Sequence, residues 1–171
     1  MESLYEYLKE RLNGAGRLAV LGAGSTLRGD DAAGMAVVEE LQAAFDQTLW
    51  PDLLLCPGET APENYSGKIK RFCPTHLVAI DAADVGKAPG TVVEIQPEDV
   101  GGPTFCSHML PLRVMISYLA QETGADVTLL GIQYKSIEFD TAMTDEMQAA
   151  ARGLSGALKQ VIRDVLGGNQ E

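Results

Sequence analysis

Three side chains able to bind metals or protons lie at or beside the ends of predicted secondary-structure elements. Asp31, with Asp30 before it, comes after the first buried segment, Asp81 ends a later buried segment, and His108 precedes a helical segment. Ligands of open α/β sheets gather at the carboxyl ends of strands, so we expect these three side chains to converge. Two carboxylates and one imidazole leave coordination positions open on a bound metal. The residues therefore predict an incomplete three-ligand metal site at the edge of a sheet.

Each of these residues also has a purely structural interpretation. Asp30 and Asp31 suit the cap of the helix that follows them, Asp81 suits a turn, and His108 suits an exposed loop. The functional hypothesis requires all three side chains to converge, and the structural interpretations do not. Cys106 is an alternative soft ligand, but no second cysteine stands at a metal-ligand spacing from it.

Familiar nucleotide and hydrolase motifs are absent. The glycine turn at 22–29 has the wrong spacing for a dinucleotide fingerprint, and two acids follow it where a pyrophosphate would lie. No P-loop lysine, HExxH helix or GxSxG elbow occurs anywhere in the sequence. We therefore expect no nucleotide cofactor, and neither a zinc-helix protease nor a serine hydrolase.

Hydrophobic patterning predicts strands that alternate with helices along the chain. The expected strands span 17–24, 52–56, 76–81, 91–95 and 127–133, and the expected helices span 32–45, 62–72, 110–122 and 145–165. This order predicts the α/β class, with a twisted, mostly parallel sheet and helices on both faces in three α/β/α layers. The segment 91–95 follows Asp81 too closely for a helical crossover, so we expect an antiparallel or edge strand there.

A short amphipathic helix is predicted at 3–12, before the first strand. Ser3 and Glu6 fit a capping box, and Leu4, Leu8 and Leu12 share one face of the helix. We expect this face to dock on the rest of the chain, with docking on a partner as the alternative. The prediction for residues 1–171 is a single domain, made of a helical extension at 1–16 and an α/β domain at 17–166.

Composition limits the partners and the compartment. The 171 residues are 46% hydrophobic and 22% charged, which argues against disorder. The net charge of -11 disfavours binding to nucleic acid and to anionic membranes, and it favours a basic peptide as partner. Three cysteines without a CxxC pair indicate a reducing compartment. No signal-peptide core and no apolar run of ~18 residues is present, so we expect a cytoplasmic protein without a membrane span.

The chain resembles the NiFe-hydrogenase maturation endopeptidases from about Leu18 to the final helix. The resemblance is carried by VLGAGSTLRGDDAAG, by GETAPEN at 58–64, by VAIDAADVGKAPGTVVEI, by SHMLPL at 107–112 and by LLGIQ at 129–133. The APEN, MLPL and GIQ stretches are most similar to the branch that serves the hydrogenase of formate hydrogenlyase. The family resemblance also implies a twisted sheet between layers of helices.

This resemblance implies an endopeptidase that removes the C-terminal extension of a nickel-loaded large-subunit precursor. It implies that Asp31, Asp81 and His108 are both the metal-recognition residues and the catalytic residues, with the nickel carried by the precursor. Activation of water by the aspartates and polarisation of the scissile carbonyl by nickel both stay open. The expected partner is the precursor, with no nucleic acid or membrane, and we expect the enzyme to be a monomer.

Two other functions remain as alternatives, and two departures from the family pattern bear on the substrate. The chain would act as a non-catalytic chaperone if it bound the large subunit or nickel without cleavage, and as a general peptidase if it cleaved metal-free substrates. Ser25 stands where the family usually has asparagine, and Cys56-Pro57-Gly58-Glu59 replaces a usual Asp-Gly-Gly turn. Neither departure involves the three expected ligands.

Overall fold

The computed structural model describes residues 3–96 and 109–167, and for residues 109–111 it describes the backbone alone. His108 and Cys106 therefore lie outside the described residues. None of the helices described is both long enough and apolar enough to cross a membrane.

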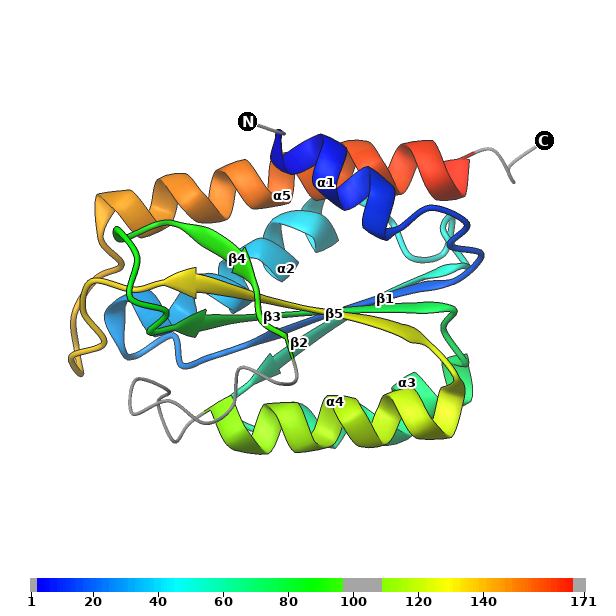
Figure 1. Cartoon of the computed structure of the whole chain (residues 1–171), viewed down its shortest axis with the longest axis horizontal. Coiled ribbons are helices and arrows are strands. Elements are labelled where there is room, and N and C mark those ends of the chain that lie inside the picture. The colour runs from blue at the N-terminus through cyan, green and yellow to red at the C-terminus, as the bar shows by residue number, and fades with distance from the viewer. Residues whose placement is uncertain (1–2, 97–108, 168–171) are drawn as a thin grey trace.

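The described residues contain one sheet of five strands in the order β2-β1-β3-β5-β4 (Figure 1). The parallel members are β1 (Leu18–Ala23), β2 (Leu53–Glu59), β3 (His76–Ala83) and β5 (Asp126–Gln133). The short strand β4 (Val92–Glu94) runs antiparallel to β5 and forms one edge of the sheet. This arrangement confirms the expectation for the segment 91–95.

Helices cover both faces of the sheet (Figure 1). One layer holds α1 (Leu4–Arg11), α2 (Ala33–Ala44) and α5 (Asp145–Leu166), and the opposite layer holds α3 (Ser66–Phe72) and α4 (Met109–Thr123). Side chains alternate between the two faces along a strand, so Leu18 and Val20 pack in the core under the first layer, while Ala19 and Leu21 pack in the core under the second. The three-layer α/β/α prediction is confirmed.

The first helix docks on the rest of the chain, as expected. Leu8 and Leu12 are fully buried and pack in the same core as Leu158 of α5. The Ser3 hydroxyl oxygen caps the helix by accepting a hydrogen bond from the Glu6 N–H at 3.2 Å. The apolar face of α1 therefore completes the core on the α5 side of the sheet.

Two elements differ most from the sequence expectation. The second strand was expected to end at Pro57-Gly58, but β2 continues to Glu59, with a register shift opposite Gly22 and Ala23. A proline is tolerated there because β2 is an edge strand, where not every backbone N–H needs a neighbour. The helix expected at 62–72 is divided into a 3-10 turn, η2 (Pro62–Tyr65), and α3.

Candidate active site

The strand order places the carboxyl ends of β1 and β3 at a topological switch point. From β1 the chain passes through η1 (Gly29–Ala32) and α2 to β2 on one side of β1, and then through α3 on the opposite face to β3 on the other side. Open α/β proteins bind their ligands at such a point, outside the carboxyl ends of the strands. Asp31 lies in η1 directly after β1, and Asp81 lies in the last part of β3.

Glycines allow the start of α2 to press directly against these strands. A Cβ atom on Gly34 would lie 2.4 Å from the Ile80 carbonyl oxygen, and one on Gly22 would lie 2.2 Å from the Gly34 carbonyl oxygen. Gly24 has φ +124°, and a Cβ there would lie 1.8 Å from the Asp31 carbonyl oxygen. Only glycine permits such close backbone contact, so these positions hold the Asp31 turn against the strand ends.

Asp31 and Asp81 form a pair of carboxyl groups in unequal surroundings. Asp81 is 7% exposed, and its Oδ1 accepts a hydrogen bond from the Ala82 N–H at 2.9 Å. Burial raises the pKa of Asp81 to about 7, and the charge of Asp31 adds to the rise. Asp31 is only partly buried, and its Oδ2 accepts a hydrogen bond from the Ser25 N–H at 2.8 Å. At neutral pH Asp81 can therefore both take up and release a proton, as a general acid or base must.

Asp30, the neighbour of Asp31, has a structural role. Its buried carboxylate accepts hydrogen bonds from the backbone N–H groups of Lys135 (2.8 Å), Ser136 (3.1 Å) and Thr144 (2.7 Å), and from the Thr144 hydroxyl (2.9 Å). Burial alone would raise the pKa of Asp30, but these hydrogen bonds outweigh it and lower the pKa. Neither Asp30 nor Asp31 caps α2, so that interpretation is wrong. Asp30 instead joins the turn after β1 to the loop after β5.

Replacing Asp30 with alanine is expected to lower the free energy of unfolding by about 3 kcal/mol at pH 7, because buried donors lose their acceptor. The folded-state pKa of Asp30 is depressed below its ordinary 3.8, so its stabilisation is complete above that value and disappears as the pH falls through the folded-state pKa. Urea unfolding at pH 7 and pH 3 measures both effects, with Asp52→Ala as a control. A loss at pH 7 no larger than that of the control would contradict the anchoring role.

The structure thus places two of the three predicted site residues at the same edge of the sheet, close enough for the charge of Asp31 to affect Asp81. Asp81 lies inside β3, so its interpretation as a turn former is wrong. His108 lies outside the described residues, and its convergence with the aspartates stays a prediction. Within residues 3–96 and 109–167, no group of three His, Cys, Asp or Glu side chains is placed to hold a metal ion.

Gln133 is a further residue at this edge whose role the sequence did not reveal. Its Oε1 accepts hydrogen bonds from the N–H groups of Val85 (2.8 Å) and Lys87 (3.1 Å), and its Nε2 donates to the Tyr134 carbonyl oxygen (3.0 Å). The side chain is buried at the end of β5, next to β3. Gln133 therefore shapes the loop that follows the strand carrying Asp81. The motif LLGIQ contains this residue, but an uncharged side chain at a strand end gave no signal of its role.

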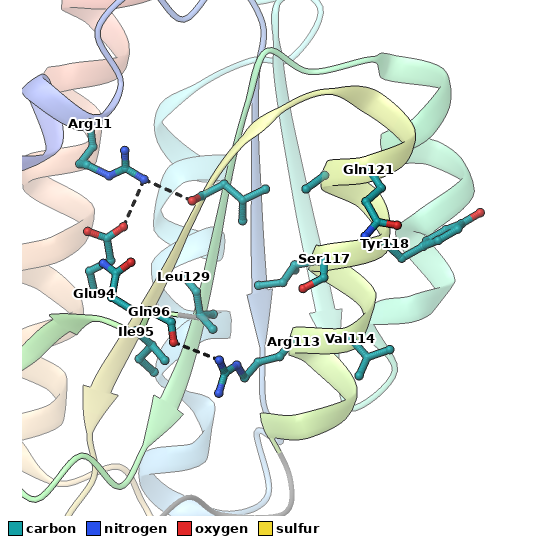
Figure 2. A pocket seen from close by; sticks show the side chains of 13 residues that line it. Arg11, Glu94, Ile95, Gln96, Arg113, Val114, Ser117, Tyr118, Gln121 and Leu129 are labelled. Carbon is teal, nitrogen blue, oxygen red and sulfur yellow. Dashed lines mark hydrogen bonds and ion pairs between the residues drawn. The ribbon is translucent and has the colours of Figure 1, made fainter. Parts of the chain in front are cut away.

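A cavity of about 750 Å³ lies elsewhere, between α4 and the β4–β5 edge (Figure 2). On one side Arg113 donates a hydrogen bond to the Gln96 carbonyl oxygen at 3.0 Å. On the other side Arg11 donates to the Val127 carbonyl oxygen at 3.2 Å and forms an ion pair with Glu94 at 3.1 Å. Neither aspartate of the candidate site lines this cavity, and its arginines are not suited to proton transfer. The cavity is therefore distinct from the candidate site at the switch point.

The fold and the position of the two aspartates define an α/β protein with two carboxyl groups at the carboxyl ends of its parallel strands. A family model described as hydrogenase maturation protease matches residues 35–162, which include Asp81. A putative hydrogenase maturation protease of Methanocaldococcus jannaschii is 30% identical over 164 residues, covering 94% of this chain and 96% of that protein.

Two further comparisons agree with these. The Hydrogenase 3 maturation protease of Escherichia coli K12 is 33% identical over 132 residues, covering 77% of this chain and 81% of that protein. The crystal structure of a NiFe-hydrogenase maturation protease from Thermococcus kodakarensis superimposes with a TM-score of 0.84 at 30% identity, covering 92% of this chain and 99% of that one. The chain belongs to the hydrogenase maturation protease family, which confirms the resemblance found in the sequence.

Proposed function

We propose that this chain is an endopeptidase that removes the C-terminal extension of a nickel-loaded NiFe-hydrogenase large-subunit precursor. Family membership supports the reaction and the kind of substrate. The assignment to a site rests on Asp31 and Asp81, which lie at the switch point of the sheet. Asp81 is buried, and its pKa is raised to about 7. The net charge of -11 favours a basic precursor tail over nucleic acid or an anionic membrane, and the proposed compartment is the cytoplasm.

The nickel belongs to the substrate in this proposal. Asp31, Asp81 and His108 contact the nickel of a docked precursor, so that only a precursor with inserted metal presents its scissile bond to the enzyme. Carboxylate oxygens and imidazole nitrogen are suitable ligands for nickel. A set of three leaves the remaining coordination positions to the precursor itself. The part assigned to His108 rests on the family resemblance.

Hydrolysis then requires a water molecule whose oxygen attacks the scissile carbonyl carbon. The water proton passes to a carboxylate and then to the leaving amine, while the peptide C–N bond breaks. Asp81 is the residue we propose for this transfer, because a pKa near neutrality suits a general acid or base. Polarisation of the carbonyl by the substrate's nickel is compatible with the same geometry and would lower the barrier further.

Cleavage assays with purified components test the proposal. The precursor is prepared with and without nickel, mixed with the chain at a substoichiometric ratio, and followed by gel shift and by the mass of the released tail. We expect repeated turnover of the loaded precursor and no cleavage of the metal-free one. Stable binding without tail release would contradict the peptidase and support a chaperone. Equal cleavage of both precursors would contradict nickel recognition and support a general peptidase.

A further inference from the structure

Two exposed apolar side chains lie on the loops next to the aspartate pair. Leu27, in the turn between β1 and η1, is 59% exposed, and Phe139, in the loop between β5 and α5, is 65% exposed. A single exposed leucine or phenylalanine is ordinary on a protein surface. Here, however, the two residues come from segments far apart in the sequence that meet at the candidate site.

The two loops are joined by backbone hydrogen bonds. The Asp140 N–H donates to the Leu27 carbonyl oxygen at 2.8 Å, and the Gly29 N–H donates to the Thr141 carbonyl oxygen at 3.1 Å. Next to these bonds, the buried carboxylate of Asp30 ties the ends of the Phe139 loop to the start of η1. The positions of the two apolar residues are therefore set before any partner binds, which reduces the entropy cost of binding.

The Phe139 ring is also held by a cation. The Arg28 guanidinium lies 6.0 Å from the ring centroid, within the range of a cation–π interaction. Leu27 precedes Arg28 in the chain, and its carbonyl oxygen is bonded to the N–H of Asp140, the neighbour of Phe139, so the backbone segments that carry the leucine and the ring are adjacent. Both side chains are largely exposed, and the two together are called the apolar subsite below.

The apolar subsite is connected to Asp31 through the turn after β1. The Asp31 N–H donates to the Arg28 carbonyl oxygen at 3.0 Å, so the turn that carries Leu27 leads directly into Asp31. Leu27 and Asp31 are four positions apart in the chain, and four residues span at most about 14 Å. A peptide in extended conformation rises about 3.3 Å per residue, so one that contacts Asp31 can reach Leu27 within a few residues.

We propose that Leu27 and Phe139 receive an apolar side chain of the precursor close to its scissile bond. This inference rests on the proposed function, because it takes the precursor as the occupant. Burial of both side chains by the substrate contributes to binding in the ground state and in the transition state alike, so it affects KM and leaves kcat unchanged. The subsite thereby fixes the register of the tail relative to the aspartates.

Steady-state cleavage of the nickel-loaded precursor by Leu27→Ser, Phe139→Ser and the double variant tests the subsite. We expect KM to rise about tenfold or more in the double variant, with kcat unchanged. Leu49→Ser is the matched control, because Leu49 is 67% exposed but precedes β2 at the amino end of the strands. Phe139→Tyr keeps the ring and is expected to retain the wild-type KM. Urea unfolding of every variant checks that the fold is unchanged.

The substrate supplies the second half of the test. Each apolar residue near the cleaved bond of the precursor is replaced in turn with serine, and each product is assayed with the wild type and with the double variant. One of these substitutions is expected to raise the KM of the wild type and to add little to that of the double variant, because both changes remove the same contact.

Three results would overturn the subsite. An unchanged KM in the double variant, with cleavage intact, would contradict the subsite while leaving the proposed function standing. Self-association of the wild type in sedimentation experiments, lost in the double variant, would assign the surface to a second copy of the chain instead. Failure of the wild type to cleave the loaded precursor at all would remove the proposed function and the subsite together.

Discussion

Replacing Asp81 with asparagine is expected to lower kcat/KM for a nickel-loaded precursor at least about a hundredfold. Asparagine has nearly the same shape, and its side-chain oxygen can still accept the hydrogen bond that the Ala82 N–H donates to Asp81. It cannot take up a proton at neutral pH or contact a metal as an anion. Asp31→Asn removes the other member of the pair and is expected to lower cleavage in the same direction.

Asp52→Asn is the matched control, because it makes the same charge change at the amino end of β2, away from the site. Single-turnover assays on gels, with each protein in excess over precursor, compare the three variants with the wild type. Wild-type cleavage by both Asp81→Asn and Asp31→Asn would exclude the aspartate pair from the reaction. A collapse of the fold in Asp81→Asn would leave Asp31→Asn, at a partly buried position, to decide the point.

The same Asp81→Asn variant shows how the buried carboxyl group of Asp81 changes the free energy of unfolding with pH. The folded-state pKa of Asp81 is raised from the ordinary 3.8 to about 7, so the folded protein holds this proton more tightly than the unfolded chain does. That stabilisation is complete below the unfolded-state value and is lost as the pH rises through about 7. Relative to Asp81→Asn, the wild type is therefore expected to lose about 2–3 kcal/mol of unfolding free energy between pH 5 and pH 8.

Local patterning was sufficient to predict the layers of the fold. Leu18, Ala19, Val20 and Leu21 form a continuous apolar run, which is typical of a strand buried on both faces, and the structure divides these side chains between two cores. The antiparallel direction of β4 was predicted because the connection between Asp81 and this strand is too short for a crossover helix. The end of β2 could not be predicted, because the tolerance for Pro57 depends on its being at the sheet edge, which only the whole strand order determines.

The candidate site was predictable as far as it depends on strand ends. The rule for α/β sheets selected Asp31 and Asp81, which the structure places at the same edge of the sheet. It could not distinguish Asp30 from Asp31, because adjacent acids in a turn look alike in sequence. Only the meeting of the 24–30 turn with the 134–144 loop, more than a hundred residues later, shows that Asp30 is an anchor. The apolar subsite depends on the same long-range meeting, for which no local pattern exists.

The value of kcat/KM for the loaded precursor is expected to fall about tenfold per pH unit below pH 7 and to level off above it. This dependence reports the essential groups of the free enzyme. In the free enzyme burial, assisted by the charge of Asp31, raises the pKa of Asp81 to about 7. Metal contact or proton uptake by Asp81 needs the ionised carboxylate, so the enzyme must first lose this proton. A decline above pH 7 would instead show that the reaction needs protonated Asp81, as in a carboxyl pair that shares one proton.

Carbon NMR of the labelled aspartate carboxyl groups measures the same ionisation directly in the free enzyme. We expect one buried carboxyl to titrate near pH 7 in the wild type and to be missing from Asp81→Asn. In Asp31→Asn the pKa of Asp81 is expected to fall, because the neighbouring charge is gone, but to stay above 3.8, because burial persists as the larger cause. Agreement between this titration and the kinetic profile would identify Asp81 as the group that controls cleavage. A kinetic midpoint that did not move with the Asp81 pKa in Asp31→Asn would assign the pH dependence to another group.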